Sequence, residues 1–187
     1  MHPARVVLDM TQKDEMPDPP DPIEERIKDP TGAKAEAWRN TFDDMEAIAA
    51  DRRSDGWEVL TVTSIHTDTV SIDMREDDEF GLKMIIPDNH AEEFEPLYDP
   101  EEFTEYLSYG REVEGLMYAV LEFIDSDTER SILVACRYDM RMAEGMVASA
   151  QAEGALYTHL RTIDGTKIGV FEHEEWKPLV SPPARSN

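Results

Sequence analysis

The hydrophobic pattern of the chain changes its period several times, and each change predicts a new element. The first periodic stretch places apolar side chains at helical spacing, at Trp38, Phe42, Met45 and Ala49. This helix is predicted to begin near Asp29 and Pro30, with the proline in its first turn, and to end at Gly56.

Short runs that are rich in β-branched residues follow and predict strands. The predicted strands span residues 57–65, 69–74 and 80–87, and an acidic turn at residues 75–79 joins the last two. Residues 88–110 return to a helical pattern, which is interrupted at Asp99-Pro100 and is expected to stop at Gly110.

Two hairpins and one helix complete the pattern. Residues 114–124 and 130–138 predict the first hairpin, a helix capped by Asp139 is expected to run to Gly154, and residues 155–173 predict the second hairpin. The resulting order, α-βββ-α-ββ-α-ββ, predicts one α+β domain over residues 30–179. We expect a mainly antiparallel sheet with helices packed on one face.

Both ends of the chain lack the apolar content of a folded domain. Residues 16–30 contain five prolines among acidic side chains, and residues 1–29 are predicted to form a disordered acidic tail. Residues 180–187 are predicted to form a loose C-terminal tail. Since the first nine residues lack the acidic bias of the rest, Met10 is an alternative to Met1 as the true start.

The charge of the chain indicates its solvent. Asp and Glu number 42 against 18 Lys and Arg, so the formal net charge is −24. Like charges repel over roughly 30 Å in dilute buffer but over only about 3 Å at 1 M salt, so such a chain suits a very salty medium. We therefore expect a salt-adapted cytoplasmic protein, in preference to an acidic protein of ordinary salt or one that binds basic partners.

Several classes of function are not expected. The sequence has no Lys or Arg cluster that would neutralise phosphates, so nucleic-acid binding is not predicted. Its longest apolar runs are far shorter than the ~20 residues that span a bilayer, so membrane binding is not predicted either. The one cysteine, Cys136, lies within an apolar run and predicts a buried structural thiol without a disulfide.

Several local sequences, taken together, resemble one family. They are Gly56-Trp57, His66 with Asp68, Pro87-Asp88-Asn89, Tyr138-Asp139 and the stretch from Thr158 through His159 to Arg161. Over residues 38–175 the chain resembles a haloarchaeal family that carries only a domain-of-unknown-function label. The resemblance implies the salty compartment and implies no activity or functional residue.

Residues 130–170 escape the acidic composition. They carry five basic and four acidic side chains, a net charge of +1, so the other 146 residues carry −25. Burial is the first interpretation of this low-acid segment, a subunit or partner interface the second, and an anion site the third. The candidate ligand or interface residues are Arg137, Arg141, His159 and Arg161.

The second hairpin has two possible registers. A two-residue turn at Asp164-Gly165 pairs His159 with Val170 and His173 with Leu156, on opposite faces. A three-residue loop with Gly165 in the left-handed conformation unites the apolar side chains Leu156, Leu160, Ile168 and Val170 on one face. We favour the second register, which places His159, Arg161 and His173 on the other face.

Other motifs carry weaker signals. His66 and Asp68 could form half of an acid-base site, although a surface histidine beside a turn aspartate explains them as well. His90 and Glu93 have metal-ligand spacing, but a capping box at a helix start accounts for this sequence better. We therefore predict neither a metal nor a cofactor.

The function predicted from these observations is a non-catalytic binding or assembly module that uses residues 130–170. The expected partners are a second copy of the chain or another protein, with a small anionic ligand as a further candidate. The alternative is a small hydrolase or transferase in which His66 and Asp68 form the acid-base pair. The sequence does not decide whether the protein is an enzyme.

Overall fold

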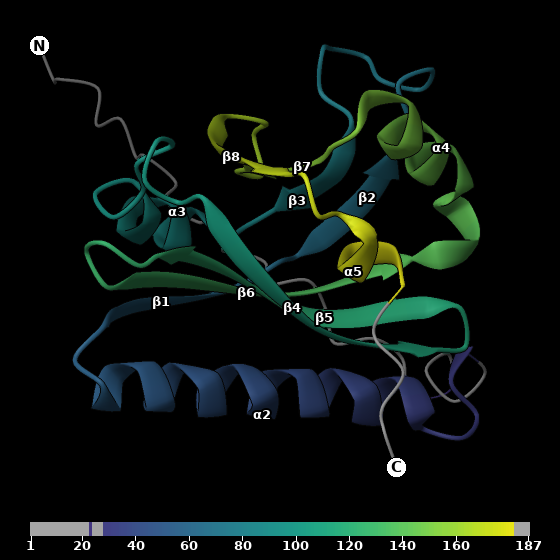
Figure 1. Ribbon diagram of the computed structural model, residues 1–187. Helices are drawn as coiled ribbons and strands as arrows, with labels where there is room; N and C mark the ends of the chain where they lie inside the picture. Colours follow the sequence, from purple (N-terminus) through teal and green to yellow (C-terminus); the bar gives the residue numbers. More distant parts are fainter. Residues whose placement is uncertain (1–22, 24–27, 182–187) are drawn as a thin grey trace, which may run out of the picture.

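The computed structural model describes residue 23 and residues 28–181, which form a three-layer sandwich of one helix and two sheets. Helix α2 (Ala33–Ser54) lies beneath the first sheet, and the second sheet lies above it (Figure 1). The predicted tails, residues 1–29 and 180–187, fall almost wholly outside the described residues.

The first sheet is mixed. In spatial order its strands are β1 (Glu58–Thr63), β6 (Arg130–Asp139), β5 (Leu116–Asp125) and β4 (Glu105–Val113). β1 runs parallel to β6, and the other neighbours are antiparallel. The predicted hairpin of residues 114–124 and 130–138 is therefore confirmed as β5 and β6.

The second sheet is mixed as well. Its strands, in spatial order, are β2 (His66–Val70), β3 (Gly81–Ile85), β7 (Leu156–Arg161) and β8 (Lys167–His173). β3 and β7 are parallel, and β2 and β8 form the two edges. The α+β class and the predicted order are confirmed, but each sheet combines parallel and antiparallel pairs.

The remaining helices are short. They are α3 (Asp88–Phe94), the 3-10 turn η1 (Met140–Met142), α4 (Glu144–Glu153) and α5 (Lys177–Val180). They lie on the side of the second sheet, opposite α2, so the helices do not pack on one face as predicted (Figure 1). The predicted helix of residues 88–110 ends at Phe94, and its last six residues, 105–110, belong to strand β4.

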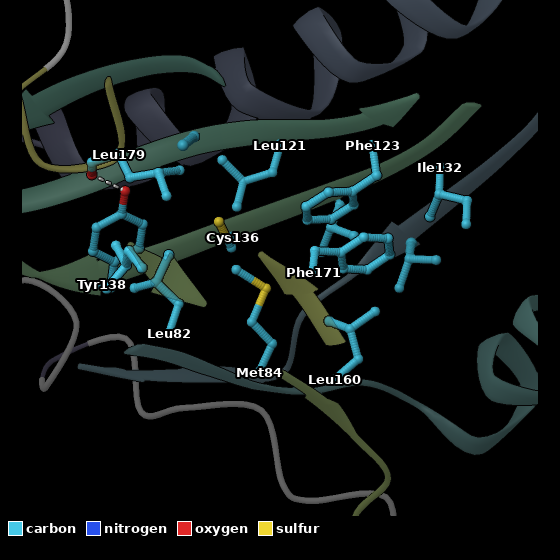
Figure 2. Packing of buried hydrophobic residues seen from close by; sticks show 14 of the residues in the cluster. Leu82, Met84, Leu121, Phe123, Ile132, Cys136, Tyr138, Leu160, Phe171 and Leu179 are labelled. Carbon is cyan, nitrogen blue, oxygen red and sulfur yellow. Dashed lines mark hydrogen bonds between the residues drawn. The ribbon is translucent and has the colours of Figure 1, made fainter. Parts of the chain in front are cut away.

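The main core fills the space between the sheets. Alternate residues of β5 and β6 point into it, and the rings of Phe123 from β5 and Phe171 from β8 stack with their centroids 3.7 Å apart (Figure 2). The hydroxyl of Tyr138 donates a hydrogen bond to the carbonyl oxygen of Leu179, which fastens α5 to this core. Cys136 is fully buried here, and burial raises the pKa of its thiol to about 12, as a structural cysteine requires.

The opposite face of the first sheet packs on α2. Met45 and Ala49 of the helix contact Val120, Leu133 and Ala135 of the sheet, which confirms the predicted apolar face of this helix. Glu122 is a fully buried charge on the same side of the sheet. Its carboxylate accepts a 2.7 Å hydrogen bond from Nε of Arg52 and a 2.8 Å bond from the hydroxyl of Ser131.

The second hairpin adopts the register that we did not favour. His173 pairs with Leu156, and His159 pairs with Val170, up to a bulge between Leu160 and Arg161. The core therefore receives Phe171 and His173 from β8, Ile168 packs against it partly buried, and Val170 is exposed. A polar contact makes this possible, because His173 Nε2 lies 2.8 Å from the buried hydroxyl of Thr158.

Candidate functional site

The outer face of the second sheet collects polar side chains from three strands. Asp68 of β2 lies opposite Lys83 of β3, which lies opposite His159 of β7. Alternation along each strand produces this row, because the intervening residues point into the core. Adjacent strands lie about 4.8 Å apart, so Asp68 and His159 are roughly 10 Å from each other.

The acidic loop of residues 71–80 folds over part of this face. Both Asp77 and Glu79 accept hydrogen bonds from Nη2 of Arg161, and Lys83 Nζ lies 3.2 Å from Asp77 while Lys167 Nζ lies 3.0 Å from Glu79. The bond from Arg161 holds the pKa of Asp77 well below its usual range. The positive charges of this face are therefore neutralised from within the chain.

His159 is buried beneath the same loop. Its Nε2 lies 2.9 Å from the carbonyl oxygen of Phe80, and its residue is only 6% exposed. Burial lowers the pKa of His159 and keeps the imidazole neutral near pH 7. His159 and Arg161 thus lie on the face opposite the core, as predicted, but both already have partners.

The two other candidate arginines have separate surroundings. Arg137 of β6 points toward α2, where its guanidinium lies 5.7 Å from the ring centroid of Trp38. Arg141 lies in η1 and forms hydrogen bonds of 2.9 and 2.8 Å with the carboxylate of Asp139. The four predicted residues therefore occupy three places and do not converge.

A groove of about 640 Å³ follows the free edge of the second sheet. Six consecutive residues line it, 66–71, which include the whole of β2. The opposite wall consists of Asp139, Met142, Gly145 and Met146, all within the low-acid segment of residues 130–170. A Cβ at Gly145 would lie 3.0 Å from Cβ of Ser71, so this glycine lets α4 approach the end of β2.

His66 and Asp68 lie at the rim of this groove. His66 Nε2 and Asp68 Oδ1 are 2.6 Å apart, and the two side chains are 60% and 61% exposed. Asp139 lines the same groove but is hydrogen-bonded to Arg141. The histidine and the aspartate thus form the predicted pair on an open surface.

Two methionines give the groove an apolar rim. Met74 is 77% exposed and Met142 is 73% exposed, which places both among the most exposed large apolar side chains of the described residues. Thioether side chains are flexible and polarizable, and they are common at surfaces that bind varied partners. Of the residues that line this groove, His66 and Asp68 were candidates from the sequence, whereas Met74 and the threonines of β2 gave no signal before folding.

Metal sites and membrane-spanning helices are absent from the described residues, which are residue 23 and residues 28–181. Within them no three or more His, Cys, Asp or Glu side chains are arranged to hold a metal ion. None of the described helices is both long and apolar enough to cross a bilayer.

Comparison with protein families gives one match. The model named Family of unknown function (DUF7529) matches residues 24–181, which is most of the chain. The chain belongs to this family. No match to this DUF7529 chain was found among curated proteins or among solved structures. The match covers both sheets and the groove, so the site described above belongs to the shared domain.

Proposed function

We propose that this DUF7529 protein is a non-catalytic binding module that takes an extended segment of a partner protein as an added strand along β2. The observation that carries the proposal is the continuous lining of the groove by residues 66–71 at the edge of the second sheet. An edge strand offers unpaired backbone N–H and C=O groups, and partner segments use them in strand addition.

The groove supplies the two requirements of this binding mode. Backbone groups of β2 provide affinity, and pockets beside the strand select alternate side chains of the added segment. Met74 and Met142 line this groove with exposed side chains, and they provide apolar surface for the side chains of the added segment. β2 has five residues, so a segment of comparable length spans it at about 3.4 Å per residue.

A second candidate function rests on the pair of His66 and Asp68. Their 2.6 Å contact is the geometry of a histidine oriented by a carboxylate, as a small hydrolase or transferase needs. Both side chains are exposed, and within the described part of the chain no further hydrogen bond links either side chain to a nucleophile. The binding function is therefore better supported.

Salt adaptation and a cytoplasmic location belong to the same proposal. The net charge of −24 and the use of only six lysines against twelve arginines support a protein that works in a salty cytoplasm. Among the described residues, the buried acidic side chains are Glu122 and Asp125, and the other Asp and Glu side chains are at least partly exposed. Each of the two buried carboxylates forms an ion pair with an arginine.

The test selects extended peptides from a random displayed library on the protein in molar KCl. Binding of a selected peptide is then measured by fluorescence anisotropy. We expect the double variant Met74→Ala, Met142→Ala to weaken binding about tenfold, which corresponds to roughly 1.4 kcal/mol of lost apolar contact. Both residues are exposed, so the fold should remain within about 0.5 kcal/mol of wild type.

Ile163→Ala is the matched control, because Ile163 is an apolar side chain that is 66% exposed on the β7–β8 turn, away from the groove. Amide hydrogen exchange should show protection of residues 66–70 when the peptide is bound. Two results would contradict the proposal. One is a peptide that binds without protecting β2 from exchange, and the other is a peptide that binds the double variant as tightly as it binds the wild type. Protection of β2 in a self-associated protein would instead identify a second copy as the occupant.

A further inference from the structure

A second cavity, also of about 640 Å³, lies where the two sheets meet at their other edges. It opens between the segment that leads into β4 and the outer strand β8, far along the chain from the β2 groove. Eleven residues line it, from 100, 103–106 and 170–175. They include three aromatic residues, four glutamates and one buried histidine, a combination that the proposed peptide groove lacks.

The buried histidine is His173. Its residue is 1% exposed, and its Nε2 lies 2.8 Å from the hydroxyl of Thr158, while its Nδ1 has no hydrogen-bond partner among the described residues. Burial lowers the pKa of His173 to about 3, so the ring is neutral at physiological pH and one nitrogen carries a lone pair. A buried polar atom without a partner indicates a site that a ligand or a water completes.

The rim of the cavity has one sign of charge. The lining residues include Glu105, Glu172, Glu174 and Glu175, of which Glu172 also interacts with the Tyr157 side chain, and none of the described residues that line the cavity is Lys or Arg. Such a rim repels anions and concentrates cations. A cationic ligand brings N–H donors, so the complementary tautomer of His173 donates from Nε2 to Thr158 and accepts at Nδ1.

The walls suit the hydrocarbon part of such a ligand. Phe103, Tyr106 and Phe171 line the cavity, and the ring of Tyr106 lies 4.2 Å, centroid to centroid, from the ring of His173. Aromatic faces attract cations as well as alkyl chains. The hydroxyl of Tyr106 is already bonded to the carbonyl oxygen of Glu175, so this ring contributes its face and not its polar group.

We propose that this cavity binds a small primary alkylammonium compound, with its N–H donating to Nδ1 of His173, its charge balanced by the glutamate rim and its alkyl chain against Phe103 and Tyr106. The inference does not depend on the proposed peptide groove. It identifies a class of ligand by three features that the cavity combines: an acceptor, an acidic rim and an aromatic wall.

The experiment uses the full chain at a KCl concentration that keeps it folded, with n-butylammonium as the probe and n-butanol as its neutral isostere. Calorimetric titration should show n-butylammonium binding at least about tenfold more tightly than n-butanol. Nitrogen NMR of the imidazoles should show a shift of the unprotonated His173 Nδ1 resonance with n-butylammonium alone. The shift at this one atom distinguishes the site from general attraction to an acidic surface.

The variant that tests the rim is Glu172→Gln, Glu174→Gln, Glu175→Gln. All three residues are exposed, so we expect the substitutions to leave the fold intact. Its affinity for n-butylammonium should fall about tenfold. The control, Asp43→Asn, Glu46→Gln, Asp51→Asn, changes three exposed acids of α2 by the same total charge and should change the affinity by less than about twofold.

Three results would overturn the proposal. One is equal binding of n-butanol and n-butylammonium. Another is an equal loss of affinity in the rim variant and the α2 control, which would show that net charge alone attracts the cation. The third is an unchanged His173 Nδ1 resonance at the highest n-butylammonium concentrations, whether or not calorimetry detects binding.

Discussion

Gly81→Ala should be among the most damaging small substitutions in this fold. Gly81 begins β3 with a φ of +114°, and a Cβ built there would lie 2.1 Å from the carbonyl oxygen of Tyr157 in β7. Real Cβ atoms do not approach backbone so closely, so β3 must move away from β7. The parallel pairing that begins with Leu82 opposite Thr158 is the first contact affected.

The magnitude follows from two contributions. A non-glycine residue at this φ costs about 1–3 kcal/mol of backbone strain. Loss of one or two hydrogen bonds between β3 and β7 adds about 0.5–1.5 kcal/mol for each. We therefore expect Gly81→Ala to lower the free energy of unfolding by about 1.5–6 kcal/mol, a large share of the ~5–15 kcal/mol of a typical domain.

Gly165→Ala is the matched comparison. Gly165 also has a positive φ, of +88°, but nothing lies within 4 Å of the Cβ position. Its alanine variant should therefore cost only the strain, about 1–2 kcal/mol. Urea unfolding of both variants at one fixed KCl concentration, followed by circular dichroism, gives the two free energies. Equal losses in the two variants would show that the contact with β7 is not what requires Gly81.

Three further predictions concern charge. Arg52→Ala should cost about 2–3 kcal/mol of unfolding free energy in urea titration, because Glu122 is fully buried and loses its partner, whereas the exposed neighbour variant Arg53→Ala should cost under about 0.5 kcal/mol. The folded pKa of His173 lies below the unfolded value of 6.5, so the stability that the neutral ring contributes is present above pH 6.5 and is lost as the pH falls toward 3. The variant His173→Gln should therefore show a smaller change in unfolding free energy between pH 7 and pH 5.5 than the wild type does. The melting temperature should rise from dilute buffer to molar KCl because −24 is then screened, and an unchanged value would refute salt adaptation.

The elements that bury the most apolar surface were the ones that the sequence predicted well. β5 and β6 are buried along almost their whole length, and a continuous apolar run is the sequence pattern typical of such buried strands. The helix α2 was predicted from one apolar face, which packs on the first sheet. In both places local pattern and tertiary burial agree, which is why pattern alone was sufficient.

β4 shows why the rest of the fold was harder. It is an edge strand in which residues alternate between exposed and half-buried, so it has no strong apolar pattern of its own. Its strand conformation comes from pairing with β5 along its full length, from Glu105 opposite Ile124 to Val113 opposite Leu116. Such pairing is a long-range effect that a helical interpretation of residues 88–110 could not include.

The predicted register of the second hairpin was wrong for a different physical reason. Apolar patterning favoured the face that unites Leu156, Leu160, Ile168 and Val170, since it treats every polar residue as a surface residue. The fold instead buries His173 with Thr158, and this pair satisfies two polar groups with each other. A polar pair of this kind is visible only when both partners are placed in space.

The low-acid segment of residues 130–170 has a similar explanation. Its positive charges have partners within the chain: Arg130 bonds to Asp125 and Glu102, Arg137 lies against Trp38, Arg141 bonds to Asp139, and Arg161 and Lys167 meet the acidic loop of residues 71–80. A charge count along the sequence cannot show this, because Asp77 and Glu79 lie more than eighty residues from Arg161.

This pairing changes the order of the ligand candidates. An anion at Arg161 would have to displace Asp77 and Glu79, which hold the same guanidinium and are part of the folded loop. A peptide along β2 displaces no ion pair of that cluster, because the backbone edge of a strand needs only backbone partners. An ammonium compound beside His173 meets carboxylates with no Lys or Arg among the described residues of the cavity lining. The internal neutralisation of the basic side chains therefore argues against an anion site at Arg161, and it is compatible with the two binding sites that we propose.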